Sequence, residues 1–143
     1  MTSAIRVFAA ATAAMLLAVA AAQAQEPRSQ GRVGLELNKL EQVDDACRVY
    51  LVLRNGAAAY DSFKLDIVLF DAGGVIARRV AVEAGPLPPG RPTVKLFDVQ
   101  GLPCERIGSF LVNDVLECRP ARDAADCLAL IEASSRTDVE ILR

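Results

Sequence analysis

The chain has 143 residues, 16 of them basic and 18 acidic, and a formal net charge of −2 at pH 7. Histidine is absent, which excludes histidine-based triads, histidine zinc ligands and an imidazole acid or base. The basic residues form no long cluster, only the pair Arg78-Arg79, so nucleic acid is not expected as a partner.

The first 24 residues have the features of a cleaved secretory signal peptide. Arg6 precedes an apolar, alanine-rich run from Val7 to Ala22, and Ala22-Gln23-Ala24 supplies a small-x-small cleavage site. The apolar run is shorter than the roughly 20 residues that span a bilayer, which makes a membrane anchor the less favoured alternative. A single arginine favours the general secretion route over the twin-arginine one.

Cleavage after residue 24 would leave one exported domain. Residues 25–32 are polar and lack periodicity, which predicts a flexible N-terminus. Residues 33–143 are enough for a domain that buries its own core. We expect this domain to be periplasmic or secreted, with no membrane anchor after cleavage.

Alternation of apolar and polar residues predicts a series of β-strands. Residues 47–55 place an apolar side chain at every second position from Cys47 to Leu53, and residues 62–71 do the same from Phe63 to Leu69. The predicted strands span residues 33–43, 47–55, 62–71, 75–85, 93–99 and 107–118.

Two of these segments depart from simple alternation. In residues 75–85, which follow a DAGG turn, Arg78 shares a face with apolar residues, and this predicts a β-bulge or an edge position. Residues 107–118 are apolar on both faces, so we expect a strand covered on both sides. The proline-rich residues 86–92 are interpreted as a loop rather than as a ligand for a proline-binding groove.

The last third of the chain changes its period. Asp123 is expected to cap a short helix of about ten residues, whose apolar stripe includes Leu128 and Ile131. Alternation of Thr137, Val139 and Ile141 then predicts a short strand or an ordered tail. Six strands, or seven with the tail, favour an all-β antiparallel sandwich, with a small barrel as the alternative.

Four cysteines match two disulfide bonds in an exported protein. No CxxC pair is present, which disfavours a thioredoxin-like redox site and a zinc knuckle. A four-thiolate metal site and a catalytic thiol remain as alternatives. Of the three possible pairings we expect Cys47–Cys104, since both begin a strand, and Cys118–Cys127, which would join a strand end to the nearby helix.

Acidic residues near strand ends raise the possibility of other sites. Asp44-Asp45 and Asp71 could bind calcium, which needs six or more oxygen ligands, but a role in turns is favoured. Asn113-Asp114 lies inside an apolar strand and could mark a ligand site. Hydrogen bonding across strands at a β-bulge is the favoured interpretation.

Two tyrosines are candidate contact residues. Tyr50 and Tyr60 could be exposed anchors of a binding face. Amphipathic rings that lie on a sheet surface are an equally good interpretation.

The segment from Val49 to Val82 resembles an immunoglobulin-like module of the FxLYD type. The shared stretch is KLDIVLFDAGGVIARR, with Leu69-Phe70-Asp71 at the place of the signature and Ile67 in place of its first aromatic residue. The resemblance implies an immunoglobulin-like sandwich.

The mature chain also resembles small exported bacterial proteins of unassigned activity, commonly labelled by a twin-arginine signal sequence. The shared stretches are DACRVYLVLRNG, VKLFDVQGLPCERIG and NDVLEC. The chain departs from that label because Arg6 is the only arginine before the apolar run. The resemblance brings no catalytic residues.

These observations predict a non-enzymatic periplasmic binding or assembly module. The sequence does not identify its partner, and another envelope protein is the candidate. We assign no catalytic, cofactor-binding or metal-binding residues and expect no cofactor. The alternatives are an exported thiol- or carboxylate-dependent enzyme or redox protein, and a purely structural envelope component.

Overall fold

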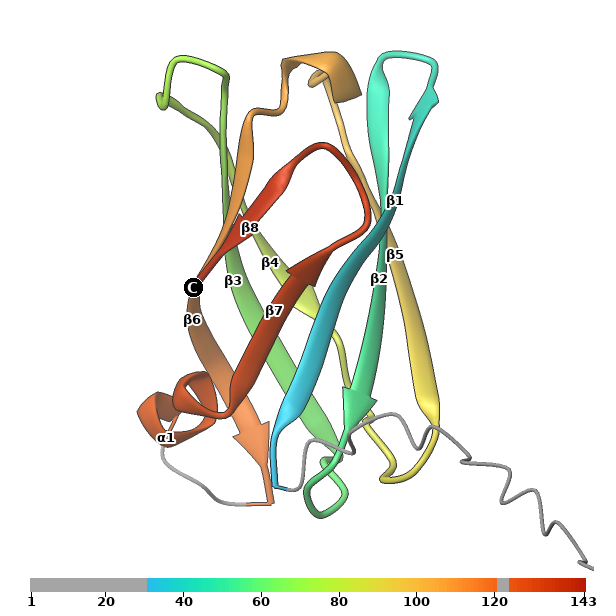
Figure 1. Ribbon diagram of the computed structural model, residues 1–143, viewed down its shortest axis with the longest axis vertical. Helices are drawn as coiled ribbons and strands as arrows, with labels where there is room; N and C mark the ends of the chain where they lie inside the picture. The colour runs from blue at the N-terminus through green and yellow to red at the C-terminus, as the bar shows by residue number, and fades with distance from the viewer. Residues whose placement is uncertain (1–30, 121–123) are drawn as a thin grey trace, which may run out of the picture.

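The protein is a β-sandwich of two four-stranded sheets (Figure 1). A computed structural model describes residues 31–120 and 124–143. The predicted signal peptide, most of the predicted flexible N-terminus and the predicted helix cap at Asp123 therefore lie outside the described residues. The elements are β1 (Val33–Val43), β2 (Ala46–Asn55), β3 (Ser62–Phe70), β4 (Ile76–Glu83), β5 (Pro92–Val99), a 3-10 turn η1 (Cys104–Arg106), β6 (Ser109–Arg119), α1 (Ala124–Ala129), β7 (Ile131–Ser135) and β8 (Glu140–Leu142).

The first sheet has the strand order β5-β2-β1-β7 and the second has the order β4-β3-β6-β8. All pairings among β1 to β6 are antiparallel. The two late strands pair in parallel, β7 with β1 and β8 with β6. The predicted all-β sandwich with one short helix near the C-terminus is confirmed, with eight strands in place of six or seven.

The core lies between the two sheets and follows the predicted alternation. Every second residue of β2 from Cys47 to Leu53 is fully buried, as is every second residue of β3 from Phe63 to Leu69. Burial of one such Leu, Ile or Phe side chain stabilises the fold by roughly 1.5–3 kcal/mol. The facing rows of these strands hold the two sheets together.

Strand β6 is not covered on both sides, and that prediction is wrong. Leu116 is 47% exposed, whereas Phe110 and Val115 are fully buried. The pairing with β3 shifts register twice, so Asn113 and Leu116 each have no partner in β3. Each extra residue reverses the alternation, which is why buried residues occur at both even and odd positions.

Strand β4 confirms the predicted irregularity of residues 75–85. It is the outer strand of the second sheet. Its pairing with β3 moves from Leu69–Arg78 to Phe70–Ile76, which leaves Ala77 as an extra residue. Both an edge position and a bulge are therefore present.

The C-terminal region differs from the prediction. The helix α1 has six residues and ends at Ala129, and Ile131 begins strand β7 rather than continuing the helix. Ile131 is fully buried opposite Val33 of β1. The strand predicted around Ile141 is confirmed as β8.

Candidate functional site

The two disulfides have the predicted connectivity. Cys47 of β2 is bonded to Cys104 of η1, with a Cα–Cα distance of 4.8 Å. Cys118 of β6 is bonded to Cys127 of α1, with a Cα–Cα distance of 6.6 Å. These bonds use all four cysteines of the chain. With every sulfur oxidised, no thiolate is present to act as a nucleophile or as a metal ligand.

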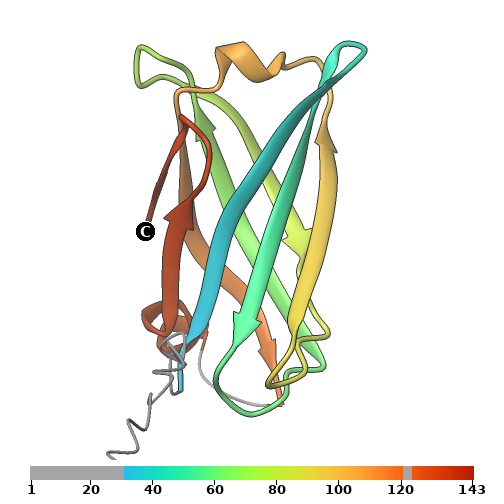
Figure 2. The ribbon, with the colours of Figure 1, turned by 45° about the vertical axis from the view of Figure 1, so that its right-hand side comes forward.

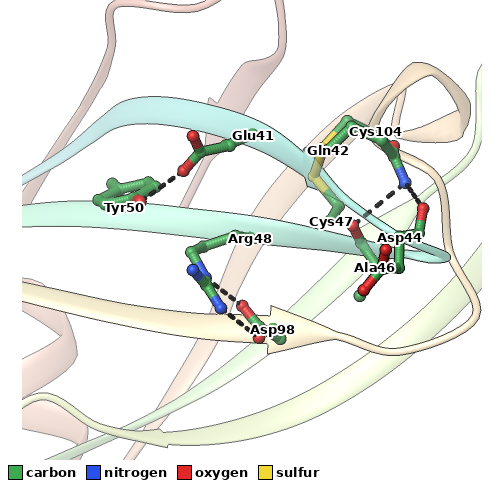
Figure 3. The surroundings of a disulfide bond; sticks show 9 residues. All are labelled: Glu41, Gln42, Asp44, Ala46, Cys47, Arg48, Tyr50, Asp98 and Cys104. Atoms are coloured by element: carbon green, nitrogen blue, oxygen red, sulfur yellow. Dashed lines mark hydrogen bonds and ion pairs between the residues drawn. A yellow bond between two sulfur atoms is a disulfide. The ribbon is translucent and has the colours of Figure 1, made fainter.

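Gln42 connects the first disulfide to the β1–β2 turn (Figure 3). Its side-chain oxygen accepts a hydrogen bond from the backbone N–H of Cys104, at 2.9 Å. Its side-chain nitrogen donates to the carbonyls of Asp44 and Ala46. The Asp44-Asp45 pair therefore belongs to a turn, in which Asp44 has a left-handed φ of 51°.

Asp71 also serves a turn. One of its carboxylate oxygens accepts hydrogen bonds from the backbone N–H groups of Gly73 and Val75, each at 2.9 Å. This arrangement is the side-chain mimic of a backbone turn that Asp commonly forms. Within residues 31–120 and 124–143 there is no group of three or more Asp, Glu, Cys or His side chains placed to hold a metal ion.

Asp66 is a buried carboxylate on the outer face of the second sheet. It is only 3% exposed and accepts two hydrogen bonds from the guanidinium of Arg79, at 2.9 and 2.8 Å. Asn113, the extra residue of the β6 bulge, donates to it at 2.6 Å. The Arg79 guanidinium lowers the pKa of Asp66, burial opposes this shift, and Asn113 adds to it.

These contacts explain the polar pair inside strand β6. Asn113 forms the predicted hydrogen bond across strands at a bulge, which confirms the favoured interpretation over a ligand site. Asp114 lies opposite Asp66 and accepts a hydrogen bond from the backbone N–H of Val115. Both oxygens of Asp66 are already engaged, so this cluster holds a fixed ion pair and offers no open acid or base.

The two tyrosines have different roles. Tyr60 is only 4% exposed, and its ring packs edge-on against Phe63 with the centroids 5.1 Å apart. Tyr60 is therefore a core residue, and both interpretations that placed it on the surface are wrong. Its backbone pairs with Leu87, which brings the loop after β2 over the end of the sandwich.

Tyr50 lies half-buried on the outer face of the first sheet. Its hydroxyl donates to Glu41 at 2.5 Å (Figure 3), and Lys39 Nζ lies 5.1 Å from the ring centroid. These contacts match an amphipathic ring that lies on a sheet surface.

The outer face of the first sheet carries exposed apolar side chains on strand β5. Val94 is 60% exposed and Leu96 is 56% exposed. They lie opposite the half-buried Val52 and Tyr50 of β2. We call these four residues the β5 patch.

Ion pairs border the β5 patch at both ends. Arg48 and Asp98 form two hydrogen bonds, at 2.7 and 2.9 Å (Figure 3), and this pairing lowers the pKa of Asp98. At the other end, Arg54 lies 3.5 Å from Glu36. An apolar centre with a polar rim is typical of protein-contact surfaces.

Strand β5 also has a free edge. It is the outermost strand of the first sheet on one side of the molecule, whereas β7 and β8 lie together on the opposite side (Figure 2). There Arg143 donates hydrogen bonds to the carbonyls of Ala129 and Ile131, at 3.2 and 2.5 Å. Within residues 31–120 and 124–143, the C-terminal strand and its last residue thus cover the β7 side, and no segment covers the β5 edge.

A shallow hollow lies between η1 and the loop of residues 136–139. Leu40, Cys104 and Ile107 line its apolar part. Its guanidinium group, from Arg136, is paired with Glu36 at 3.0 Å. Two carboxylates, from Glu105 and Asp138, also line the hollow, and among the described residues they belong to no group of three or more side chains that could hold a metal ion.

Two residues of strand β5 are typical of a sheet edge. Pro92 at the start of the strand and Lys95 in its middle are both typical of edge strands. Alternation identifies the two faces of residues 93–99. The exposure of Val94 and Leu96, however, depends on the position of β5 at the edge of its sheet, where only β2 pairs with it. The strand order of the whole sheet determines that position.

The fold and the disulfides together define a disulfide-bonded all-β sandwich suited to an oxidising environment. No helix among the described residues is long and apolar enough to span a membrane.

No protein-family model and no curated protein matches the sequence. Among solved structures, the chain is similar to IrmA from Escherichia coli, with a TM-score of 0.60 and 14% sequence identity. The match covers 73% of this chain and 92% of that chain. At this level of identity the similarity concerns the fold alone.

Proposed function

We propose that the chain is a periplasmic or secreted, non-enzymatic binding or assembly module that contacts another envelope protein. The observation that carries the proposal is the β5 patch, in which Val94 and Leu96 are exposed beside an uncovered strand edge. Exposed apolar side chains on a free edge favour aggregation unless they serve a contact. The resemblance to small exported proteins supports an exported location, and the FxLYD-type resemblance supports a sandwich fold.

The chemistry of the described residues favours binding over catalysis. All four sulfurs are in disulfides, and the one strongly buried aspartate, Asp66, is fully engaged by Arg79 and Asn113. The chain has no histidine to act as a general base. Sheet faces and edges, by contrast, are surfaces that proteins commonly use for recognition.

A cross-linking pull-down from the periplasm tests the proposal. The tagged, oxidised protein is expressed with its own leader, cross-linked in intact cells and recovered under denaturing conditions. We expect one or a few envelope proteins whose capture falls when excess untagged protein is co-expressed. Capture that does not respond to this competition would contradict a binding function.

A further inference from the structure

We propose that strand β5 binds an acidic, extended segment of a partner protein, which adds to the first sheet as a further strand. This inference rests on the proposed binding function and specifies the surface, the binding mode and the chemistry of the partner. It follows from three features, which are the state of each sheet edge, the charges beside β5 and the poor fit of β5 to a second copy of itself.

The four sheet edges are not equally available. β7 and β8 are short, with five and three residues, and Arg143 already occupies the carbonyl of Ile131 on β7. β4 carries the bulge at Ala77, which disturbs the regular spacing of its backbone groups. β5 pairs with β2 over eight residues without a register shift, so it is the longest regular free edge.

The charges beside this edge are positive. Lys95 faces inward from β5 and donates to the carbonyl of Gly85, after β4, at 2.7 Å. Arg78 faces inward from β4 and reaches the carbonyl of Gly101, after β5, at 3.4 Å. Both cations thus bridge the two sheets on the open side of the sandwich.

Among the described residues, the hydrogen-bond partners of Lys95 and Arg78 are backbone carbonyls. No carboxylate of residues 31–120 or 124–143 lies within ion-pair distance of either side chain. The nearest acidic residue of β5, Asp98, is neutralised by Arg48. Glu83, the carboxylate close to Lys95, is bonded to the backbone N–H groups of Phe63 and Gly85 and to the Ser62 hydroxyl. The free edge therefore carries two cations without an ion-pair partner among the described residues, which favours an acidic partner.

An added strand would present its side chains alternately to the two faces. Those on the outer face would lie beside Val94 and Leu96, where apolar groups fit. Those on the inner face would lie beside Lys95 and Phe97 of β5. They would also face towards Arg78, which is on β4, the edge strand of the second sheet. The complementary segment thus alternates apolar with acidic residues.

A second copy of the chain fits this edge poorly. When two β5 strands pair across a two-fold axis through the middle of the strand, Lys95 lies opposite or diagonally beside Lys95 of the second copy. Like charges placed opposite one another in a sheet are destabilising. The charge that favours an acidic segment therefore disfavours pairing of β5 with itself.

Two synthetic peptides test the inference on the full mature protein with both disulfides intact. Each has eight residues, the length of β5; one alternates Val with Glu and the other alternates Val with Lys. Binding is followed by the backbone amide shifts of the isotope-labelled protein. We expect the Val–Glu peptide to bind several-fold more tightly, with the largest shifts in residues 92–99, and salt of about 1 M to remove most of the difference.

Charge reversal provides the sharper comparison. In Lys95→Glu we expect the preference to shift several-fold towards the Val–Lys peptide. Arg119→Glu, at the end of β6 in the other sheet and 68% exposed, changes the net charge equally and should leave the preference for Val–Glu unchanged. Thermal melts establish that both variants are folded. If Lys95→Glu does not fold, Lys95→Gln replaces it and should lose the preference for the Val–Glu peptide.

Several results would overturn the inference. In the peptide titrations, these are amide shifts centred outside residues 92–99, equal binding of the two peptides, or no binding of either peptide. In the charge variants, it is the same change of peptide preference in both. A further contradicting result is that a second copy or the N-terminal segment already covers the β5 amides. If the periplasmic pull-down succeeds while these peptide experiments fail, the binding function stands and only the docking mode is wrong.

Discussion

Replacing Cys47 and Cys104 together by alanine should destabilise the protein more than replacing Cys118 and Cys127 together. The first disulfide joins residues 57 positions apart and the second joins residues nine positions apart. In the chain-entropy model, these loops correspond to about 4 and about 2.5 kcal/mol of stabilisation through the unfolded state. Because three of the four sulfurs are buried, both replacements also remove core contacts, so the difference of about 1.5 kcal/mol is the informative quantity.

Equilibrium unfolding in guanidinium chloride, followed by circular dichroism, measures this difference. For the wild-type protein and the two alanine pairs, the free energy of unfolding is obtained from each protein's own midpoint and m-value, because loss of a cross-link changes the compactness of the denatured state. If removal of Cys118–Cys127 costs as much as removal of Cys47–Cys104, loop closure does not decide the ranking. The contacts that α1 makes with β6 would then be the main contribution of the second disulfide.

Three further predictions concern a carboxylate, a glycine and the N-terminus. Asp66 has a lowered pKa, so its stabilisation should be present above the unfolded value and lost below about pH 4; Asp66→Asn should flatten the acid limb of a stability–pH profile, and an unchanged slope would contradict this. Gly108→Ala should destabilise by about 1–3 kcal/mol, because its Cβ would lie 2.5 Å from the backbone oxygen of Asp71. Gly34→Ala, whose Cβ would have no neighbour closer than 3.7 Å, is the control in the same guanidinium chloride titration. N-terminal sequencing of periplasmic protein should begin at Gln25, and recovery of the uncleaved chain would contradict the predicted signal peptide.

Local alternation was enough to predict most of the sandwich. The inward rows from Cys47 to Leu53 and from Phe63 to Leu69 could be identified because a half-buried strand repeats every second residue. The disulfide connectivity was predicted correctly from an even cysteine count and from the nearness of Cys118, at a strand end, to Cys127 in the helix. The expected position of Cys104 at the start of a strand is wrong, since it lies in η1 and β6 begins at Ser109.

The features that could not be predicted depend on distant segments. β7 forms because β1 offers it a parallel partner, and β1 lies almost a hundred residues earlier in the sequence. The local sequence around Ile131, taken without this partner, has the pattern of a helix. The two bulges of β6 become visible only in its register with β3. Tyr60 became a core residue because its loop pairs with Leu87.

The candidate binding surface on β5 also depends on segments that are distant in the sequence. Val94 and Leu96 have the alternation of any half-buried strand, and their exposure follows from the position of β5 at the end of its sheet. Asn113 was the exception, since a polar residue inside an apolar strand already indicated a bulge. Surface function in such a sandwich is therefore read from topology more than from motifs.

Site-specific cross-linking in the periplasm tests the central claim most directly. A photoreactive residue replaces Leu96 on β5 in one strain and Ile76 on β4 in another, since both side chains are exposed to a similar extent, at 56% and 62%. We predict a discrete, competable adduct with an envelope protein from position 96 and a much weaker one from position 76. Equal adducts from both positions, or an adduct from position 76 alone, would contradict the assignment of β5 as the binding surface.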